Sequence, residues 1–201
     1  PPLSKEVLTG AKQAEDVYFH SSEFFEESGI QLCLGSRAVQ LDTDVKKITL
    51  ETGDELSYDT AVIATGARPR TLPGVVDLPG VHLMRTLDDA TDICNSFDSA
   101  YRLVVIGAGF IGSEVASSAK SRGLAVTIVE AASQPLEAAV GAQVGKRCAA
   151  LHEIYDVGLR CGVGVAGIEA STSGLRVTLS DGEAVLCDVA VVGIGVTPNI
   201  E

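Results

Sequence analysis

The hydrophobic pattern is clearest from about residue 101 onward. The short apolar runs RLVVI (102–106) and AVTIVE (125–130) flank FIGSEVASSAKSRG, whose apolar residues have helical spacing. A strand, a glycine turn, a helix and a second strand within about 30 residues are typical of a βαβ unit. This part of the chain is therefore predicted to be an α/β fold built on a parallel sheet.

Three further elements are predicted after this unit. A helix fits residues 142–155, LRVTLSDGEAVLCD predicts a hairpin that turns at Asp181-Gly182, and VAVVGIG (189–195) predicts a final strand. The apolar stripe of the helix consists of Val144, Cys148, Leu151 and Tyr155.

The first part of the chain has a different pattern. Val17, Phe24 and Phe25 have near-helical spacing before Gly29, which predicts a helix over 11–28. Residues 30–64 contain alternating, β-branched segments with a turn at Gly53-Asp54. They predict a small antiparallel meander that leads into a buried strand at 60–64. The prolines and glycines of ARPRTLPGVVDLPGVH then predict a linker, marked by Pro69, Pro73 and Pro79.

Two segments resemble each other within the chain. YDTAVIATGARPR and CDVAVVGIGVTPN both run from an acidic residue through an apolar strand to a glycine and a proline. Such an exit from a strand is common in itself. Its occurrence at the ends of two separate segments favours a duplicated fold over chance.

Composition and charge exclude several classes of function. The chain has 201 residues, is 46% hydrophobic and has a formal net charge of −12, which argues against binding to nucleic acid or to anionic membranes. No apolar run approaches the roughly 20 residues that span a bilayer, and PPLSKEVLTG lacks the features of a secretory signal. A soluble, cytoplasmic protein is expected. The five cysteines form no C-x-x-C pair, so we expect reduced core thiols and no metal site.

A glycine fingerprint follows the strand at 102–106. In Gly107-x-Gly109-x-x-Gly112 the first glycine permits a tight turn, the second lets the backbone approach a diphosphate, and the third lets the helix pack against the strand. The N–H groups of Phe110 and Ile111 begin the helix, where its dipole favours an anion. The spacing predicts a Rossmann-like dinucleotide site.

Two acidic residues accompany the fingerprint. Glu130 ends the second strand, 18 residues after Gly112, where a carboxylate can bind an adenosine ribose. Repulsion of a 2′-phosphate would then favour NADH over NADPH; the alternative is an ordinary solvated glutamate. Glu114 is either a first-turn carboxylate favoured by the helix dipole or a group facing the reactive end of the nucleotide. The spacing leaves both interpretations open.

An ordered set of motifs resembles one family. PPLSK, YDTAVIATGARPR, PGVHLMRTLDDA, RLVVIGAGFIGSEVA, LHE and VVGIGVTPN, in this order, resemble the flavin-dependent ferredoxin, rubredoxin and putidaredoxin reductases of the pyridine nucleotide-disulfide oxidoreductase superfamily. The resemblance covers essentially the whole chain.

The resemblance implies a specific domain organisation. Residues 1–80 would be the middle segment and linker of an FAD-binding domain, residues 81–197 an inserted NAD(H)-binding domain, and residues 198–201 the start of the return to the FAD domain. The chain would then be a central fragment, with an FAD fingerprint before it and further flavin-binding segments after it. We expect such a fragment to lose FAD and to expose apolar surface at 30–64. This segment would then either be disordered or pair between copies of the chain to give a homo-oligomer.

Individual roles also follow from the resemblance. Lys5 would pair with Glu114 beside the place where nicotinamide meets flavin, and Gly195 would lie near the nicotinamide. The residues implied to contact FAD are Ala38, Thr65, Gly66 and Arg85. Several positions depart from the family pattern: PLEAAVG lacks an arginine often found before its glycine, and Asp156 stands where a glycine usually ends a helix. Apolar residues or alanines that are common in the family are replaced by Ser113, Ser117 and Ser118. Asp tolerates the left-handed conformation, so the turn can form.

The implied activity is electron transfer. NADH would reduce FAD, and single electrons would pass to a ferredoxin- or rubredoxin-type partner. Two alternatives remain open: an NADH peroxidase, oxidase or disulfide reductase of the same superfamily, and an NADH-binding module without catalytic function.

Overall fold

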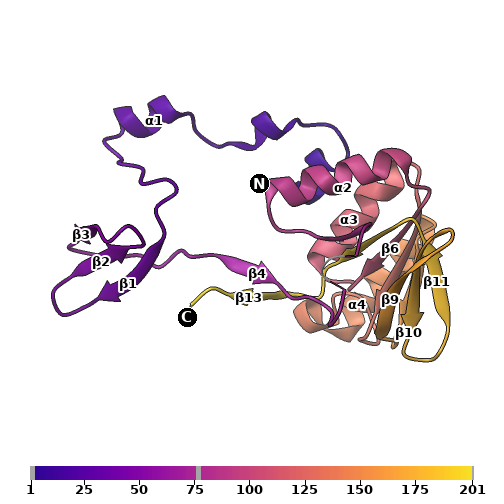
Figure 1. Ribbon diagram of the computed structural model, residues 1–201. Helices are drawn as coiled ribbons and strands as arrows, with labels where there is room; N and C mark the ends of the chain where they lie inside the picture. Colours follow the sequence, from indigo (N-terminus) through magenta and orange to yellow (C-terminus); the bar gives the residue numbers. More distant parts are fainter. Residues whose placement is uncertain (1–2, 76–77, 201) are drawn as a thin grey trace. The chain divides into compact units, whose positions relative to one another are not determined.

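A computed structural model describes residues 3–75 and 78–200 (Figure 1). Its internal contacts divide the chain into a larger unit, residues 1–17 together with 67–201, and a smaller unit, residues 18–66. The two units are described separately below. The division reflects contacts and not cofactors, so the predicted FAD and NAD(H) domains stay a prediction.

The larger unit is built on a five-stranded sheet in the order β5-β12-β6-β7-β8. All four pairs of neighbouring strands are parallel, which confirms the predicted α/β class. The strands are β5 (Val81–Leu83), β6 (Arg102–Ile106), β7 (Ala125–Glu130), β8 (Gly158–Cys161) and β12 (Val189–Val192). All four residues of β12 are buried, as expected for a central parallel strand.

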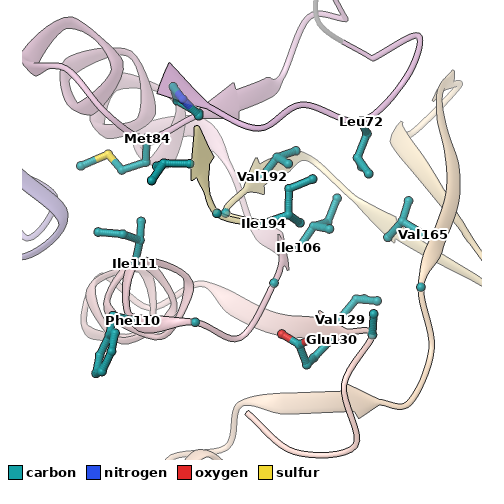
Figure 2. A pocket seen from close by; sticks show the side chains of 18 of the residues that line it. Leu72, Met84, Ile106, Phe110, Ile111, Val129, Glu130, Val165, Val192 and Ile194 are labelled. Atoms are coloured by element: carbon teal, nitrogen blue, oxygen red, sulfur yellow. The ribbon is translucent and has the colours of Figure 1, made fainter. Parts of the chain in front are cut away.

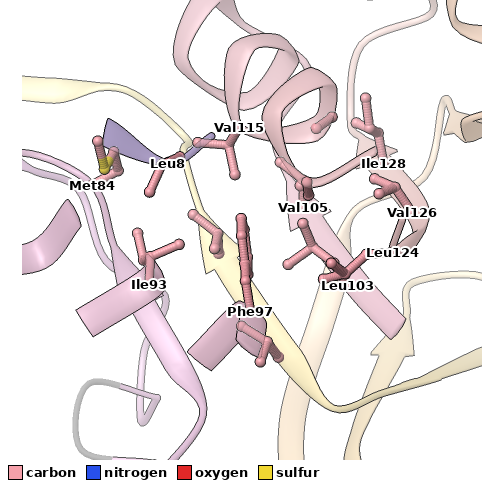
Figure 3. Close-up of a cluster of buried hydrophobic side chains, with 14 of the residues drawn as sticks. Leu8, Met84, Ile93, Phe97, Leu103, Val105, Val115, Leu124, Val126 and Ile128 are labelled. Carbon is pink, nitrogen blue, oxygen red and sulfur yellow. The ribbon is translucent and has the colours of Figure 1, made fainter. Parts of the chain in front are cut away.

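Helices cover one face of this sheet. Helix α3 (Phe110–Ser121) connects β6 to β7 and completes the predicted βαβ unit. Helix α2 (Leu87–Ser99) begins with a capping box between Thr86 and Asp89. These helices and η1 (Leu3–Val7) share a hydrophobic cluster with the sheet, drawn in Figure 3.

An antiparallel sheet packs on strands of the parallel sheet through a second hydrophobic cluster. It consists of β9 (Val165–Ser171), β10 (Gly174–Leu179) and β11 (Ala184–Cys187). The hairpin between β10 and β11 turns where it was predicted, with Gly182 in a left-handed conformation (φ +88°) and its N–H bonded to Leu179 O. The parallel sheet therefore lies between helices and the antiparallel sheet.

The two segments that resemble each other in sequence meet in the structure. Strand β4 (Ala67–Pro69) pairs antiparallel with β13 (Val196–Pro198), so each strand contributes the residues just after its shared glycine. The predicted linker is thus only partly confirmed, because it contains β4 and β5 as well as turns. Residues 76–77 of that linker lie outside the described residues.

The smaller unit contains the predicted meander. Strands β1 (Ala38–Asp42), β2 (Lys47–Leu50) and β3 (Glu55–Ser57) pair antiparallel in that order. The turn between β2 and β3 contains Gly53 at φ +91°, as the sequence predicted.

The predicted single helix over 11–28 is wrong. The structure has a 3-10 turn, η2 (Ala14–Val17), and a separate short helix, α1 (Ser22–Glu27). Ser21 has an extended backbone and is the N-cap residue of α1, although its side chain makes no capping hydrogen bond, so the chain leaves the helical conformation between η2 and α1.

The predicted buried strand at 60–64 is also wrong. These residues form no strand, and Val62 and Ile63 are 85% and 68% exposed. In the part of the chain that the structure describes, no strand runs beside them, so a strand here would have no ladder of hydrogen bonds. The expected apolar exposure of 30–64 is confirmed at these two positions and at Leu34.

Helix α4 (Glu137–Ile154) covers the predicted helix 142–155 except for Tyr155, which is its C-cap, and it has a break at Gly141 (φ +78°). Its predicted apolar stripe does not form core, since Val144, Leu151 and Tyr155 are exposed. Gly145 is the residue of α4 that is buried, and a Cβ there would lie 2.6 Å from Pro135 O. The helix therefore approaches its neighbours through its smallest residue.

Helix α4 ends as the sequence predicted. Asp156 adopts a left-handed conformation (φ +55°) directly after it. Lys120 on α3 pairs with the Asp156 carboxylate at 2.7 Å, and this hydrogen bond lowers the pKa of Asp156.

Within the described chain, no helix is long and apolar enough to cross a membrane.

The cysteines are only partly in the core. All five are free, and Cys187 is buried, which raises the pKa of its thiol to about 11. Cys33 is exposed, contrary to the expectation of core thiols.

Asp188, between β11 and β12, is expected to stabilise the larger unit in a pH-dependent way. Its carboxylate accepts bonds from Arg102 Nη2 (2.6 Å) and from the N–H groups of Tyr101 and Arg102, and these bonds lower its pKa to about 2. A depressed pKa stabilises the fold above the ordinary pKa of 3.8, and this contribution is lost as the pH falls through about 2.

The variant Asp188→Asn should therefore lower the free energy of unfolding by roughly 1–2 kcal/mol at pH 6, with a smaller difference at pH 3. Urea unfolding at both pH values measures this. If Asp188→Asn lowered the free energy of unfolding by the same amount at pH 6 and pH 3, the charge of Asp188 would not be the source of the stabilisation.

Candidate functional site

A cavity of about 700 Å³ opens at the carboxyl ends of β6, β7 and β12 in the larger unit (Figure 2). Dinucleotides bind at this end of open parallel sheets. The walls are mostly apolar, and among the described residues that line the cavity Glu130 is the only charged one. The apolar lining is supplied largely by Leu72, Met84, Ile106, Val129, Val163, Val165, Val192, Ile194 and Val196.

The glycine fingerprint forms one wall of this cavity. Gly107 follows β6 at φ +100°, and a Cβ there would lie 2.5 Å from Gly193 O. A Cβ on Gly112 would overlap Gly107 O. The first and third glycines therefore have the turning and close-packing roles that the spacing predicted.

Gly109 differs from the other two glycines. It lines the cavity, and a Cβ there would meet no protein atom within 4 Å. The protein itself therefore does not require a glycine at this position. Close approach of a ligand to the backbone is a physical reason for one.

The start of α3 offers N–H groups to the cavity. Gly109 is the N-cap and has no side chain to bond them, and the first helical bond runs from Ser113 N to Gly109 O. The preceding amides of Phe110 and Ile111 lie in the first turn, whose N–H groups have no helical acceptor. Both residues are partly exposed and line the cavity. This arrangement fits an anionic group such as a diphosphate.

Glu130 ends β7 and is held firmly. Its Oε2 accepts the N–H of Ala108 at 2.6 Å, and its Oε1 accepts the N–H of Ala132 at 2.8 Å. The carboxylate points towards the glycine turn in Figure 2. Each oxygen has further acceptor capacity for a sugar hydroxyl. Two backbone bonds therefore fix the orientation of the Glu130 carboxylate, and neither bond could be predicted from the sequence.

Lys5 and Glu114 form the predicted charged couple. Lys5 Nζ lies 3.1 Å from Glu114 Oε1, and the side chains are 63% and 28% exposed. Ser4 Oγ donates to the other oxygen, Oε2, at 2.5 Å. Pro1 and Pro2 of the PPLSK motif lie outside the described residues. The role of the couple beside a flavin stays a prediction.

The other predicted residues lie in both units. Gly195 (φ +105°) lines the cavity beyond β12. Arg85 is exposed, and its Nε donates to Ala67 O at 3.0 Å. Ala38, Thr65 and Gly66 belong to the smaller unit and are all exposed. Their exposure leaves them accessible to a cofactor, and their assignment to FAD stays a prediction.

Sequence reasoning missed most of the cavity lining. Val163 and Val165 contribute apolar walls but belong to no motif, and Met84 lies in the motif PGVHLMRTLDDA without an assigned role. Apolar residues near strand ends look the same in sequence whether they form core or a binding surface, so nothing local could have identified them.

Comparisons with family models, with known sequences and with solved structures agree on one family. The family model of the pyridine nucleotide-disulphide oxidoreductases matches residues 1–201. Rhodocoxin reductase from Rhodococcus erythropolis is 39% identical over 203 residues, covering 100% of this chain and 48% of that protein.

Two solved structures are similar throughout. The ferredoxin reductase of the CYP199A2 system from Rhodopseudomonas palustris has a TM-score of 0.90 at 35% identity, covering 100% of this chain and 50% of that one. The reductase in the covalent putidaredoxin reductase–putidaredoxin complex has a TM-score of 0.90 at 35% identity, covering 99% and 49%. The chain thus spans about half the length of these relatives.

Proposed function

The chain belongs to the pyridine nucleotide-disulphide oxidoreductase family, and from this premise we propose that it carries the NADH-binding part of a flavin-dependent NADH:ferredoxin or rubredoxin reductase. The observation that carries the proposal is the combination at one cavity of an open Gly109, free first-turn amides and the fixed carboxylate of Glu130. These three features match the chemistry of a dinucleotide's diphosphate and ribose.

NADH is assigned to the cavity because its diphosphate and ribose match the polar groups of the cavity. Its diphosphate would lie on the N–H groups of Phe110 and Ile111, and its adenosine ribose hydroxyls would bond to Glu130. The carboxylate would repel the additional 2′-phosphate of NADPH, which supports a preference for NADH. Gly195, which follows β12 and also lines the cavity, is assigned to the nicotinamide end.

A bound flavin would supply the two-electron to one-electron conversion that such a reductase needs. Lys5 and Glu114 would hold opposite charges beside the reacting rings, and the apolar walls would keep water from the nicotinamide. Arg85, Ala38, Thr65 and Gly66 are assigned to FAD on the basis of family resemblance. The same basis supports residues 1–80 and 198–201 as parts of an FAD domain and 81–197 as the NAD(H) domain.

The proposed electron acceptor is an iron-sulfur or rubredoxin-type protein. One similar solved structure is a reductase linked to putidaredoxin, which supports this class of partner. An NADH oxidase, a peroxidase or a disulfide reductase is the alternative within the family. Turnover assays with ferredoxin, oxygen, peroxide and a disulfide as acceptors separate these activities.

Because the chain alone is expected to lose FAD, the proposal is tested by rapid mixing of NADH with a flavin-loaded protein that contains this chain together with the remaining FAD-binding segments. NADH should bleach the visible absorbance of the oxidised flavin, and Glu114→Ala should slow this reduction by about 10-fold, or about 1.4 kcal/mol of barrier. Glu153→Ala, which changes an exposed glutamate on α4, is the control and should react at the normal rate. A flavin that NADH does not reduce would refute the proposed activity, whereas a normal rate in Glu114→Ala would refute only the role of that residue.

A further inference from the structure

Two buried serines lie next to the Lys5–Glu114 couple. Of the polar and charged residues in the described ranges, Ser4 (7% exposed) and Ser118 (4%) are the two that are buried. Ser118 is on α3, one turn after Glu114, and Ser4 is in η1. A buried hydroxyl costs stability unless it is hydrogen-bonded, so its partners indicate what it does.

Two hydrogen bonds, one to the backbone of Ser4 and one from its side chain, link Ser118 to Glu114 by way of Ser4. Ser118 Oγ donates to the backbone oxygen of Ser4 at 2.7 Å, and Ser4 Oγ donates to Glu114 Oε2 at 2.5 Å. Glu114 Oε1 faces Lys5 Nζ at 3.1 Å. Each oxygen of the carboxylate therefore has its own donor, and both donors come from η1.

The segment that supplies these donors is anchored to α3 by apolar packing. Leu8 is fully buried and lies in the same hydrophobic cluster as Val115 of α3 (Figure 3). Arg122, just after α3, donates to Leu8 O at 3.2 Å. The apolar contacts fix the segment as a whole, and the bond from Ser118 fixes the height of Ser4 along α3.

The ion pair alone is a weak means of orienting Glu114. The Lys5 side chain is 63% exposed, and exposed ion pairs contribute little because water and salt screen them. A short bond from a buried hydroxyl to a carboxylate is stronger and more directional. The orientation of Glu114 should therefore depend more on Ser4 than on Lys5.

We propose that Ser4 and Ser118 are positioning residues that set the carboxylate of Glu114, and through it the ammonium of Lys5, for electron transfer from NADH. This inference rests on the proposed function for its catalytic consequence. Ser4 acts directly on Glu114, and Ser118 acts through Ser4. The only sequence signal is that Ser118, like Ser113 and Ser117, replaces an apolar residue or alanine that is common in the family.

The first measurement follows the ammonium of Lys5 by ¹⁵N NMR of lysine-labelled protein. A Lys5 signal that depends on Glu114 is identified by its loss in Glu114→Ala. It should be lost or strongly shifted in Ser4→Ala and shifted less in Ser118→Ala. Ser117→Ala removes an adjacent, exposed hydroxyl of α3 and should leave the signal unchanged. Ser118→Thr keeps a hydroxyl and should restore the wild-type signal.

The second measurement is the rate of flavin reduction by NADH in a flavin-loaded protein that contains this chain together with the remaining FAD-binding segments. Ser4→Ala should slow it about 3- to 10-fold and Ser118→Ala about 2- to 3-fold, while the Kd for NADH stays within about 2-fold. Melting temperatures of the variants report any loss of fold. If Ser118→Ala does not fold, Ser4→Ala decides the question, because it keeps the carbonyl to which Ser118 donates.

The two measurements separate the inference from the proposed function. Wild-type Lys5 signals and rates in folded Ser4→Ala and Ser118→Ala would overturn the positioning role. A wild-type protein whose flavin NADH does not reduce would instead refute the proposed function, and the Lys5 signal would still decide whether the serines position the couple.

Discussion

Gly109→Ala is expected to weaken NADH binding by at least about 30-fold while the chain still folds. The added methyl group meets no protein atom within 4 Å, and Gly109 has an ordinary backbone conformation (φ −74°). It would, however, occupy the space where a diphosphate approaches the start of α3. Alanine is a poorer N-cap than glycine, so the free energy of unfolding should fall by no more than about 1 kcal/mol. Isothermal titration with NADH and urea unfolding measure the two effects.

Two further glycines provide controls for this variant. Gly167→Ala on β9 also adds a methyl group with no atom within 4 Å, and it should leave NADH binding unchanged. Gly112→Ala would overlap Gly107 O, so it should lose about 2–4 kcal/mol of stability as well as binding. A Gly109→Ala chain that binds NADH as tightly as the wild type would mean that no ligand lies against this turn.

Glu130→Gln is expected to reduce the preference for NADH over NADPH by about 10- to 100-fold. The substitution removes the negative charge that opposes a 2′-phosphate and keeps the size of the side chain. It also replaces one acceptor oxygen by an amide, so either Ala108 N–H or Ala132 N–H loses its bond. Affinity for NADH itself should therefore fall as well, because the Ala108 bond holds the glycine turn.

Titration of wild type and Glu130→Gln with both nucleotides gives the ratio of the two Kd values. Glu169→Gln, on the exposed face of β9, alters the net charge equally and should not change the ratio. If Glu130→Gln left the ratio as in wild type, the carboxylate would not face the ribose.

The parts of the fold that were predicted correctly are those with local causes. The β6–α3–β7 unit follows from two apolar runs separated by a glycine turn and a helical pattern, and all of its determinants lie within 102–130. The hairpin at Asp181-Gly182 and the left-handed Asp156 are local in the same way. Sequence specifies such features because the residues that form them are neighbours in the chain.

Two of the wrong predictions concern features that need distant partners. An apolar run at 60–64 has the composition of a buried strand, but a strand forms only where another strand supplies hydrogen bonds. The stripe on α4 has helical spacing, yet the helix packs through Gly145 and leaves that stripe exposed. Neither outcome can be read from the residues of the element itself.

The candidate site also combines features with local determinants and features that depend on distant residues. The fingerprint and Glu130 could be predicted from spacing, whereas the bonds that fix Glu130 and the link from Ser118 to Ser4 join residues far apart in the chain. The Lys5–Glu114 contact came from family resemblance, and no spacing rule relates residues 5 and 114.

The most direct test of the proposed NADH site is a crystal structure of the chain soaked with NADH. We expect the diphosphate to lie on the N–H groups of Phe110 and Ile111 and a ribose hydroxyl to bond to the carboxylate of Glu130. NADH bound elsewhere, or a cavity closed by its own side chains so that no nucleotide enters, would contradict the proposed site.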